Sequence, residues 1–313
     1  FTVTVRFCDQ FGNTYSATYD VSIITQDPYD EHPPTVPLVE GKRENIEVKL
    51  VTRSTNTWIR ADSSGYTSNI SSEIVVNPNL PKKLLVILPG QSIIEGKWNE
   101  LPYGTTGTPD PYVAGDERWI EAKVYATDNW YNKRYSTATV TLTSSDLHPQ
   151  VGYAPQTQVL SVEKGWGEYP FRVKLVTMGD QTITAIDTET DPALKLSTGT
   201  SSNIRIHPTD PYSIKISSYP DATKYAEYLV SGVTSTWTAG SPFDLTVTLY
   251  DRYGNKVSTG PKWNSYVGAG RGVRFKPESG DDEYFAYPQD PSVPYAGTQY
   301  TWQISDYGKK YFS

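Results

Sequence analysis

Acidic side chains gathered in loops are the residues of this sequence best suited to bind a ligand. Asp187, Glu189 and Asp191 alternate with threonines in one loop, and Asp27 and Asp30 lie close together in another. Calcium binds about six to eight oxygen atoms, supplied by carboxylates, carbonyls and water in flexible loops. The loop 187–191 has this alternation but lacks the glycine and distal glutamate of an EF-hand. Calcium at these five residues is therefore one prediction, and solvated turn charges are the alternative.

The histidines are the next candidates for acid–base or metal chemistry. His32 and His148 lie in two segments of the same pattern, Asp-x-His-Pro, and we take these segments, 30–33 and 146–149, as equivalent. His207 is also followed by proline. Catalytic groups rarely recur in every repeat of a chain, so we predict structural roles in loops for these residues.

Aromatic rings and one asparagine offer two kinds of contact with carbohydrate. Asn69 begins an Asn-Ile-Ser sequon, which is the acceptor sequence for N-linked glycans. Loop aromatics can stack on sugars, although they more often pack against the protein itself. The candidates expected in loops are Trp98, Trp166, Trp237, Trp263, Tyr103, Tyr112 and Tyr287.

Common catalytic motifs are missing from the sequence. It contains no G-x-S-x-G, no H-E-x-x-H, no phosphate-binding loop and no C-x-x-C. We therefore predict a protein that is not an enzyme and that uses no cofactor, calcium excepted.

Composition limits the kinds of partner and the cellular compartment that we expect for this protein. A net charge of −7 and a pI of about 5.1 argue against nucleic acid, which favours a basic surface. No run of about 18 apolar residues exists, so we expect no membrane span. Cys8 is the single cysteine, and the strand pattern places it on an outward face. The Thr-, Ser- and Tyr-rich composition favours export to the cell surface.

One sequence pattern, repeated three times, organises the chain. A strand that alternates apolar and polar residues is followed each time by Asp-x-aromatic-x-Asn. The copies are FTVTVRFCDQFGN, IEAKVYATDNWYN and FDLTVTLYDRYGN, at residues 1–13, 120–132 and 243–255. Near-even spacing of a long pattern indicates repeated modules.

Alternation and turn residues predict short strands throughout the chain, as in a β-sandwich. The only stretch where a helical turn is arguable is 219–230. The fold class predicted is all-β, with tandem Ig-like β-sandwich modules in an elongated array. The predicted modules are 1–78, which lacks its first strand, 79–208, which is complete, and 209–313, which lacks its last strands. The main strands are expected at 15–24, 45–53, 57–61, 72–77, 84–88, 119–126, 135–143, 159–162, 171–177, 182–187, 203–207, 212–217, 243–250, 272–275 and 299–305.

Three segments carry a resemblance to a known family. Residues 239–255 (AGSPFDLTVTLYDRYGN), 300–313 (YTWQISDYGKKYFS) and 174–187 (KLVTMGDQTITAID) resemble parts of tandem bacterial Ig-like modules of large secreted and cell-surface proteins. Such modules are used as adhesin stalks, as building blocks of surface layers and as spacers in exported enzymes. The middle copy departs from the pattern with Trp130 and Tyr131, where the family has aromatic-Gly.

The resemblance leaves several functions open. The first hypothesis is a non-catalytic structural repeat protein of an exported surface layer, filament or sheath. The alternatives are an adhesin stalk or a carbohydrate- or protein-binding module, and an accessory region of a large secreted enzyme. Strands lacking at the module ends also predict partners, namely neighbouring modules or copies of the chain itself that complete the sheets by strand addition.

Overall fold

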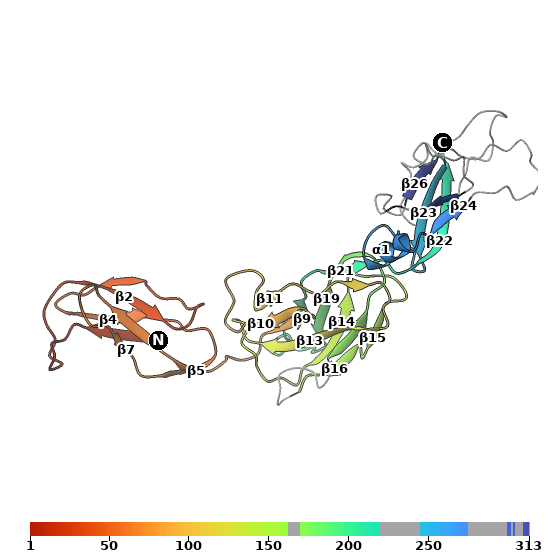
Figure 1. Cartoon of the computed structure of the whole chain (residues 1–313). Helices are drawn as coiled ribbons and strands as arrows, with labels where there is room; N and C mark the ends of the chain where they lie inside the picture. The colour runs from red at the N-terminus through yellow and green to blue at the C-terminus, as the bar shows by residue number, and fades with distance from the viewer. Residues whose placement is uncertain (162–169, 219–244, 275–298, 302, 304–308, 313) are drawn as a thin grey trace, which may run out of the picture.

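A computed structural model describes the chain except residues 162–169, 219–244, 275–298, 302, 304–308 and 313. Its regular elements are strands in small sheets, with one short helix among the described residues, and the predicted all-β class is confirmed. Figure 1 shows three groups of sheets that follow one another along the chain. No helix in the described part is long and apolar enough to cross a membrane.

The first group of strands lies within residues 1–78. One sheet has the order β3-β2-β6-β7, and two further antiparallel pairs are β1-β4 and β5-β8. Alternate residues of β2 and β4, such as Val21, Ile23 and Ile46, enter one buried cluster, against which Val3 and Val5 of β1 pack. The strands are β1 (Thr2–Arg6), β2 (Asp20–Thr25), β3 (Thr35–Pro37), β4 (Lys42–Glu47), β5 (Ser54–Thr57), β6 (Ile59–Asp62), β7 (Asn69–Ile70) and β8 (Ile74–Val76).

The second group forms a sandwich. The sheets β15-β17-β13-β9 and β16-β14-β19-β20 contribute to one core, because Val124 of β13 and Leu142 of β14 belong to the same buried cluster. Smaller sheets are β12-β21-β18, where β12 and β21 run parallel, and β10-β11. The strands are β9 (Lys83–Ile87), β10 (Gln91–Ile93), β11 (Thr105–Gly107), β12 (Tyr112–Val113), β13 (Ile120–Thr127), β14 (Thr139–Ser144), β15 (Gly152–Ala154), β16 (Thr157–Val159), β17 (Phe171–Lys174), β18 (Gly179–Gln181), β19 (Ile183–Asp187), β20 (Gly199–Thr200) and β21 (Ile204–His207).

The third group repeats the central strands of the second. Strand β23 pairs with β22 and β26, as β13 pairs with β9 and β17, and β24 pairs with β25. Strand β1, the counterpart of β13 and β23 in the first group, pairs only with β4 among the described residues. The elements are β22 (Pro211–Ser218), β23 (Leu245–Asp251), α1 (Pro261–Gly268), β24 (Gly272–Arg274), β25 (Gln299–Thr301) and β26 (Lys309–Phe312).

Helix α1 corrects one expectation from the sequence. Only 219–230 was considered for a helical turn, and that stretch lies outside the described residues. The helix at Pro261–Gly268 is only eight residues long and buries a single side chain, Trp263, so its apolar pattern at Trp263, Tyr266 and Val267 spans barely one turn. The proline in its first turn was the available signal, because proline favours the start of a helix.

Several predicted strands are shorter in the structure. The strand expected at 15–24 begins only at Asp20, and those expected at 45–53 and 171–177 end at Glu47 and Lys174. The last parts of these two predictions fail for a shared reason. The backbone amides at 51–53 and at 176–178 donate to side chains instead of to a neighbouring strand, whereas Val48 and Lys49 still donate to the Phe1 and Glu31 carbonyls.

Candidate functional site at the module junctions

The first junction joins the segment 51–53 of the first module to Asn132 of the second. The Asn132 amide Nδ2 donates to the Val51 carbonyl at 2.8 Å, and Arg53 N donates to Asn132 Oδ1 at 2.8 Å. Asn132 is 1% exposed, so these bonds are shielded from water. One asparagine side chain thus satisfies both a carbonyl and an amide of the preceding module.

The second junction repeats this arrangement between the segment 176–178 and Asn255. Asn255 Nδ2 donates to the Val176 carbonyl at 2.7 Å, and Met178 N donates to Asn255 Oδ1 at 2.8 Å. Asn255 is 6% exposed. The final asparagine of the repeated Asp-x-aromatic-x-Asn pattern therefore connects neighbouring modules in both places where the structure describes a junction.

The aspartate of the same pattern holds each asparagine in position. Asp128 Oδ1 accepts from Asn132 N at 3.0 Å, and Asp128 Oδ2 accepts from Asn132 Nδ2 at 2.9 Å. Asp251 makes the same two contacts with Asn255, at 2.9 Å and 2.8 Å. Because the turn fixes the amide orientation beforehand, little side-chain entropy is lost when the junction forms.

The linker between modules also binds these aspartates. Asn79 N donates to Asp128 Oδ2 at 2.9 Å, and Thr209 N donates to Asp251 Oδ2 at 3.0 Å. Both aspartates are buried, at 1% and 2% exposure. Each junction is thus built from a turn, a linker amide and the end of the preceding module.

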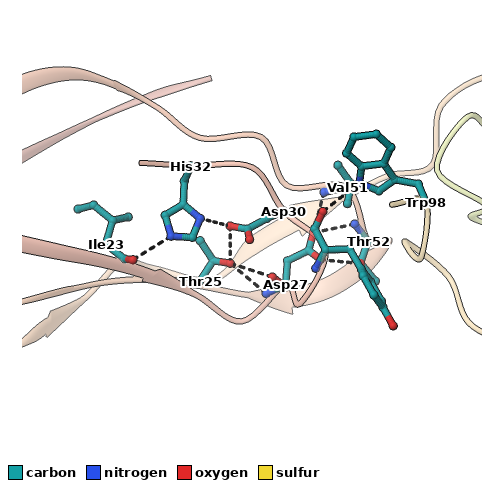
Figure 2. Close-up of polar contacts among 9 residues, drawn as sticks. Ile23, Thr25, Asp27, Asp30, His32, Val51, Thr52 and Trp98 are labelled. Atoms are coloured by element: carbon teal, nitrogen blue, oxygen red, sulfur yellow. Dashed lines mark hydrogen bonds and ion pairs between the residues drawn. The ribbon is translucent and has the colours of Figure 1, made fainter. Parts of the chain in front are cut away.

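A second aspartate, within the preceding module, binds the segment whose carbonyl accepts from the junction asparagine. Asp27 Oδ2 accepts from Val51 N at 2.6 Å and Thr52 N at 2.7 Å, and its Oδ1 accepts from the Thr52 hydroxyl at 2.6 Å. Figure 2 shows these bonds converging on the Asp27 carboxylate. The carboxylate leaves the Val51 carbonyl free to accept from the next module.

Asp146 does the same at the second junction. Its Oδ2 accepts from Val176 N at 2.7 Å and Thr177 N at 2.8 Å, and its Oδ1 accepts from the Thr177 hydroxyl at 2.6 Å. Burial alone would raise the pKa of Asp146, but these bonds outweigh it and lower the pKa below its usual value. Asp146 therefore remains ionised, as an acceptor of several N–H and O–H groups must.

This symmetry corrects the alignment of the two histidine segments. Asp146 matches Asp27 in its contacts, so the counterpart of His148 is Tyr29 and not His32. His32 instead bridges Asp30 and the Ile23 carbonyl, at 2.6 Å and 2.9 Å from its two ring nitrogens. Figure 2 shows this bridge beside Asp27. Pattern matching brought together two segments that differ in position by three residues.

The two junctions have different surroundings. At the first, the Lys49 ammonium lies 5.2 Å from the centre of the Trp98 ring and 5.4 Å from that of Trp130. The Trp98 indole N–H also donates to the Tyr29 carbonyl at 3.0 Å. Arg53 and Glu95 add an ion pair at 3.1 Å.

Rings and a glycine take the place of these charges at the second junction. Tyr253 packs against the core of the second module and meets the His148 ring edge to face, with centroids 6.1 Å apart. A side chain at Gly115 would collide with the Tyr253 hydroxyl. Nearby, burial lowers the pKa of His207, and Arg205 lowers it further.

The predicted calcium ligands already accept hydrogen bonds from neighbouring groups, and for Asp30 these are the Thr25 hydroxyl and a ring nitrogen of His32. Asp187 accepts from Glu189 N and Leu196 N, and Asp191 accepts from Ala193 N. Asp187 and Glu189 line an open hollow of about 390 Å³. No group of three or more acidic, His or Cys side chains in the described part is arranged to hold a metal. Calcium at these residues and at Asp27 and Asp30 stays a prediction, which melting curves with and without chelator would test.

The carbohydrate candidates divide into three classes. Trp166, Trp237 and Tyr287 lie outside the described residues. Trp263 is in α1 and 1% exposed, and Tyr112 is in β12, so the expectation of loops was wrong for these two. Trp98 belongs to the first junction, and Tyr103 is exposed beside Tyr131. Asn69, the sequon residue, is exposed on β7, and its glycosylation stays a prediction.

Sequence reasoning missed the residues that make the junctions. The Asp-x-aromatic-x-Asn pattern was visible, but it was interpreted as a local turn. The available signal was that Asp and Asn recur in all three copies, whereas the residues between them vary. A turn alone does not require asparagine at its last position. Chemically, the arrangement binds backbone groups, because its carboxylates accept from backbone N–H groups.

No protein-family model and no curated protein matches the chain. Among solved structures it is similar to the D0–D1 domain of intimin, with a TM-score of 0.26 and 11% identity over 66% of this chain and 88% of that one. It is similar to InvD of Yersinia pseudotuberculosis, with a TM-score of 0.31 and 12% identity over 82% and 66%. A Corynebacterium diphtheriae protein described as membrane anchored gives 0.24 and 10% over 80% and 58%.

The repeated sheets and the face-to-face core of the second group decide the fold. The chain is a tandem array of Ig-like β-sandwich modules. Successive Ig-like modules are connected through the asparagine of one and the Val-Thr segment of the module before it. The boundaries predicted at 78 and 208 stay predictions.

Proposed function

We propose that this chain is a stiff, non-catalytic stalk segment of an exported cell-surface protein, of the kind used by adhesins. The observation that carries the proposal is the junction built twice, from the same residue types, with corresponding distances within about 0.1 Å of each other. A flexible linker would need no such contacts, and linked domains move relative to one another unless an interface restrains them. A stalk needs this restraint, because it must hold a distal part away from the cell.

The role in a surface layer, filament or sheath is the second candidate. It would need contacts between chains, for which the place would be the edge of β1 that has no strand partner among the described residues. The junction contacts restrain each module against the next along the chain, and this is the property that a stalk needs. An accessory region of a large secreted enzyme would also need restrained modules. A carbohydrate-binding module would bind sugars through its exposed aromatic side chains.

The stalk proposal is tested by removing both junction asparagines. Each substitution removes two hydrogen bonds across its junction and one to the aspartate of its own turn, worth about 0.5–1.5 kcal/mol apiece, and leaves a buried carbonyl without its partner. The variant Asn132→Ala with Asn255→Ala should give a broader range of inter-module angles by small-angle X-ray scattering and negative-stain microscopy. Asn13→Ala is the matched control, because Asn13 ends the same turn but contacts no other module among the described residues.

Two results would refute the stalk. One is a wild-type chain that already bends freely at both junctions. The other is a double variant with the same distribution of angles as Asn13→Ala. Regular lattices or fibres of the native material would instead favour the surface-layer role.

A further inference from the structure

We propose that the turn 9–13 is a docking site for another Ig-like module, joined covalently ahead of Phe1. The proposal deepens the proposed stalk, and rests on it, by assigning a partner to the third copy of the turn. The surface consists of Asp9, Phe11 and Asn13, and the partner is the Val-Thr end of a module like those that present 51–53 and 176–178.

The turn already has the conformation seen at the two junctions. Asp9 Oδ1 accepts from Phe11 N and from Asn13 N, each at 2.9 Å, and Asn13 Nδ2 donates to Asp9 Oδ2 at 3.1 Å. The hydrogen bond to the Asn13 side chain, followed by those to its backbone and to Phe11 and Gly12, lowers the pKa of Asp9 against the effect of burial. The asparagine is therefore oriented before any partner arrives.

The turn 9–13 is more exposed to solvent than the other two copies of the turn. Asn132 and Asn255 are 1% and 6% exposed, whereas Asn13 is exposed. Phe11 occupies the place of the partly buried Trp130 and Tyr253, yet it is 79% exposed. The other two turns are less exposed because the end of a preceding module covers each of them.

The contact between each turn and the linker indicates that the partner module belongs to the same chain and is not a separate chain. Asp128 Oδ2 and Asp251 Oδ2 each accept from a linker amide as well as from the asparagine. Among the described residues, Asp9 Oδ2 accepts from Asn13 alone. The empty acceptor position is the one that a linker entering from a preceding module would fill.

The chemistry of the partner follows from the two examples. It presents a carbonyl to Asn13 Nδ2 and, two residues later, an N–H to Asn13 Oδ1, as Val51 with Arg53 and Val176 with Met178 do. An aspartate like Asp27 or Asp146 must hold the two amides of the Val-Thr pair, as at both junctions. At the second junction a glycine, Gly115, also leaves room for the aromatic ring of the turn.

The test extends the chain with its own sequence. Residues 79–242 are added ahead of Phe1, because they comprise the middle module and the segment that leads into Phe243, the counterpart of Phe1. The chain has one methionine, Met178, whose backbone amide binds the junction asparagine. With ¹³C-methyl methionine and the initiator removed, the extended chain gives two methyl signals, one from each copy of Met178.

In the extended chain we expect Asn13→Ala to shift the signal of the added Met178 and to leave the native one in place. Asn255→Ala should do the reverse. Phe11→Ala is the second variant, since its side chain makes no hydrogen bond within the turn and its loss spares the turn itself. Gln10→Ala, in the same turn, should move neither signal.

The proposal is overturned if Asn13→Ala and Phe11→Ala leave the added signal unmoved. It is also overturned if scattering shows the added module bending freely while the native junctions stay stiff. That last result would leave the stalk proposal intact, whereas loose native junctions would remove the stalk and the docking site together.

Discussion

The two junctions share a polar centre and differ in almost everything around it. Both use an asparagine, two aspartates and a Val-Thr segment with matching distances. The first is surrounded by a lysine between two tryptophans and by an ion pair. The second is surrounded by Tyr253, His148 and a glycine.

This difference teaches which part of the junction sets its geometry. Hydrogen bonds to backbone groups are directional and independent of side-chain identity, so the polar centre can be repeated while the sequence around it changes. Packing and charge around the centre then adjust the strength of each junction. The following variants test this division of roles.

Removing the charge of Asp27 or Asp146, the aspartates that bind the Val-Thr segments, should have the largest effect on stability. Asp146→Asn and Asp27→Asn place an NH₂ group against backbone N–H donors, and each should lower the free energy of unfolding of its module by about 3 kcal/mol. Similar losses at the two sites would support one shared centre. Urea denaturation is the measurement, and Asp20→Asn, at an exposed position, is the control. A loss no larger than that of the control would contradict the role of the polar centre.

Acid should weaken the second module through Asp146. The folded pKa of this carboxyl is lowered from the ordinary value of 3.8 by its hydrogen bonds. The stability it contributes is therefore fully present above about pH 3.8 and is lost as pH falls through the lower, folded value. Melting temperatures measured from pH 6 to pH 2 should fall less steeply in Asp146→Asn than in the wild type. Identical pH profiles would contradict this assignment.

A methyl group at Gly115 should loosen the second junction alone. The new Cβ would meet the Tyr253 hydroxyl, and overpacking of this kind costs about 1–3 kcal/mol. Gly270→Ala is a matched control, because Gly270 has the same φ of +65° with open space around it. Scattering should show bending only at the second junction. Equal effects of the two variants would assign the loss to backbone strain.

The corresponding variant of the first junction is Gly96→Ala. Its Cβ would meet the Thr52 side chain, and Gly65, with a φ of +83° against +82° and no neighbour within 4 Å, is the control. We expect bending at the first junction only, by an amount similar to that of Gly115→Ala. If Gly96→Ala also loosened the second junction, the two junctions would not be independent.

Lys49→Met should have the smallest effect. The ammonium loses its contacts with the Trp98 and Trp130 rings, which contribute about 0.5–1 kcal/mol at exposed sites, and its exposed ion pair with Glu31, which contributes about 0.2–1 kcal/mol. Lys174→Met is the control at the equivalent position of the second module. Thermal melts in low salt should show a small loss for Lys49→Met. A loss as large as that of the aspartate variants would mean that the surroundings, and not the polar centre, hold the junction.

Local patterns allowed much of the fold to be predicted. Alternation along 120–126 and 245–250 identified β13 and β23, because one face of each strand must enter a core. The ends of β4 and β17 were placed too late, since side chains far along the chain take the backbone bonds of the residues that follow. Helix α1 was missed because it has only eight residues, and its apolar residues Trp263, Tyr266 and Val267 cover little more than one turn.

The sequence by itself determined the all-β class, most of the strands and the repeated turn, since these follow from side-chain period and turn chemistry within short stretches. Only the tertiary structure decided that the asparagine of the turn binds the preceding module. That contact joins Asn132 to Val51 and Asn255 to Val176, about 80 residues apart in each case. A hydrogen bond to a backbone carbonyl does not depend on the side chain of the residue that accepts it, so the recurring Asp and Asn alone could not show which residues they bind.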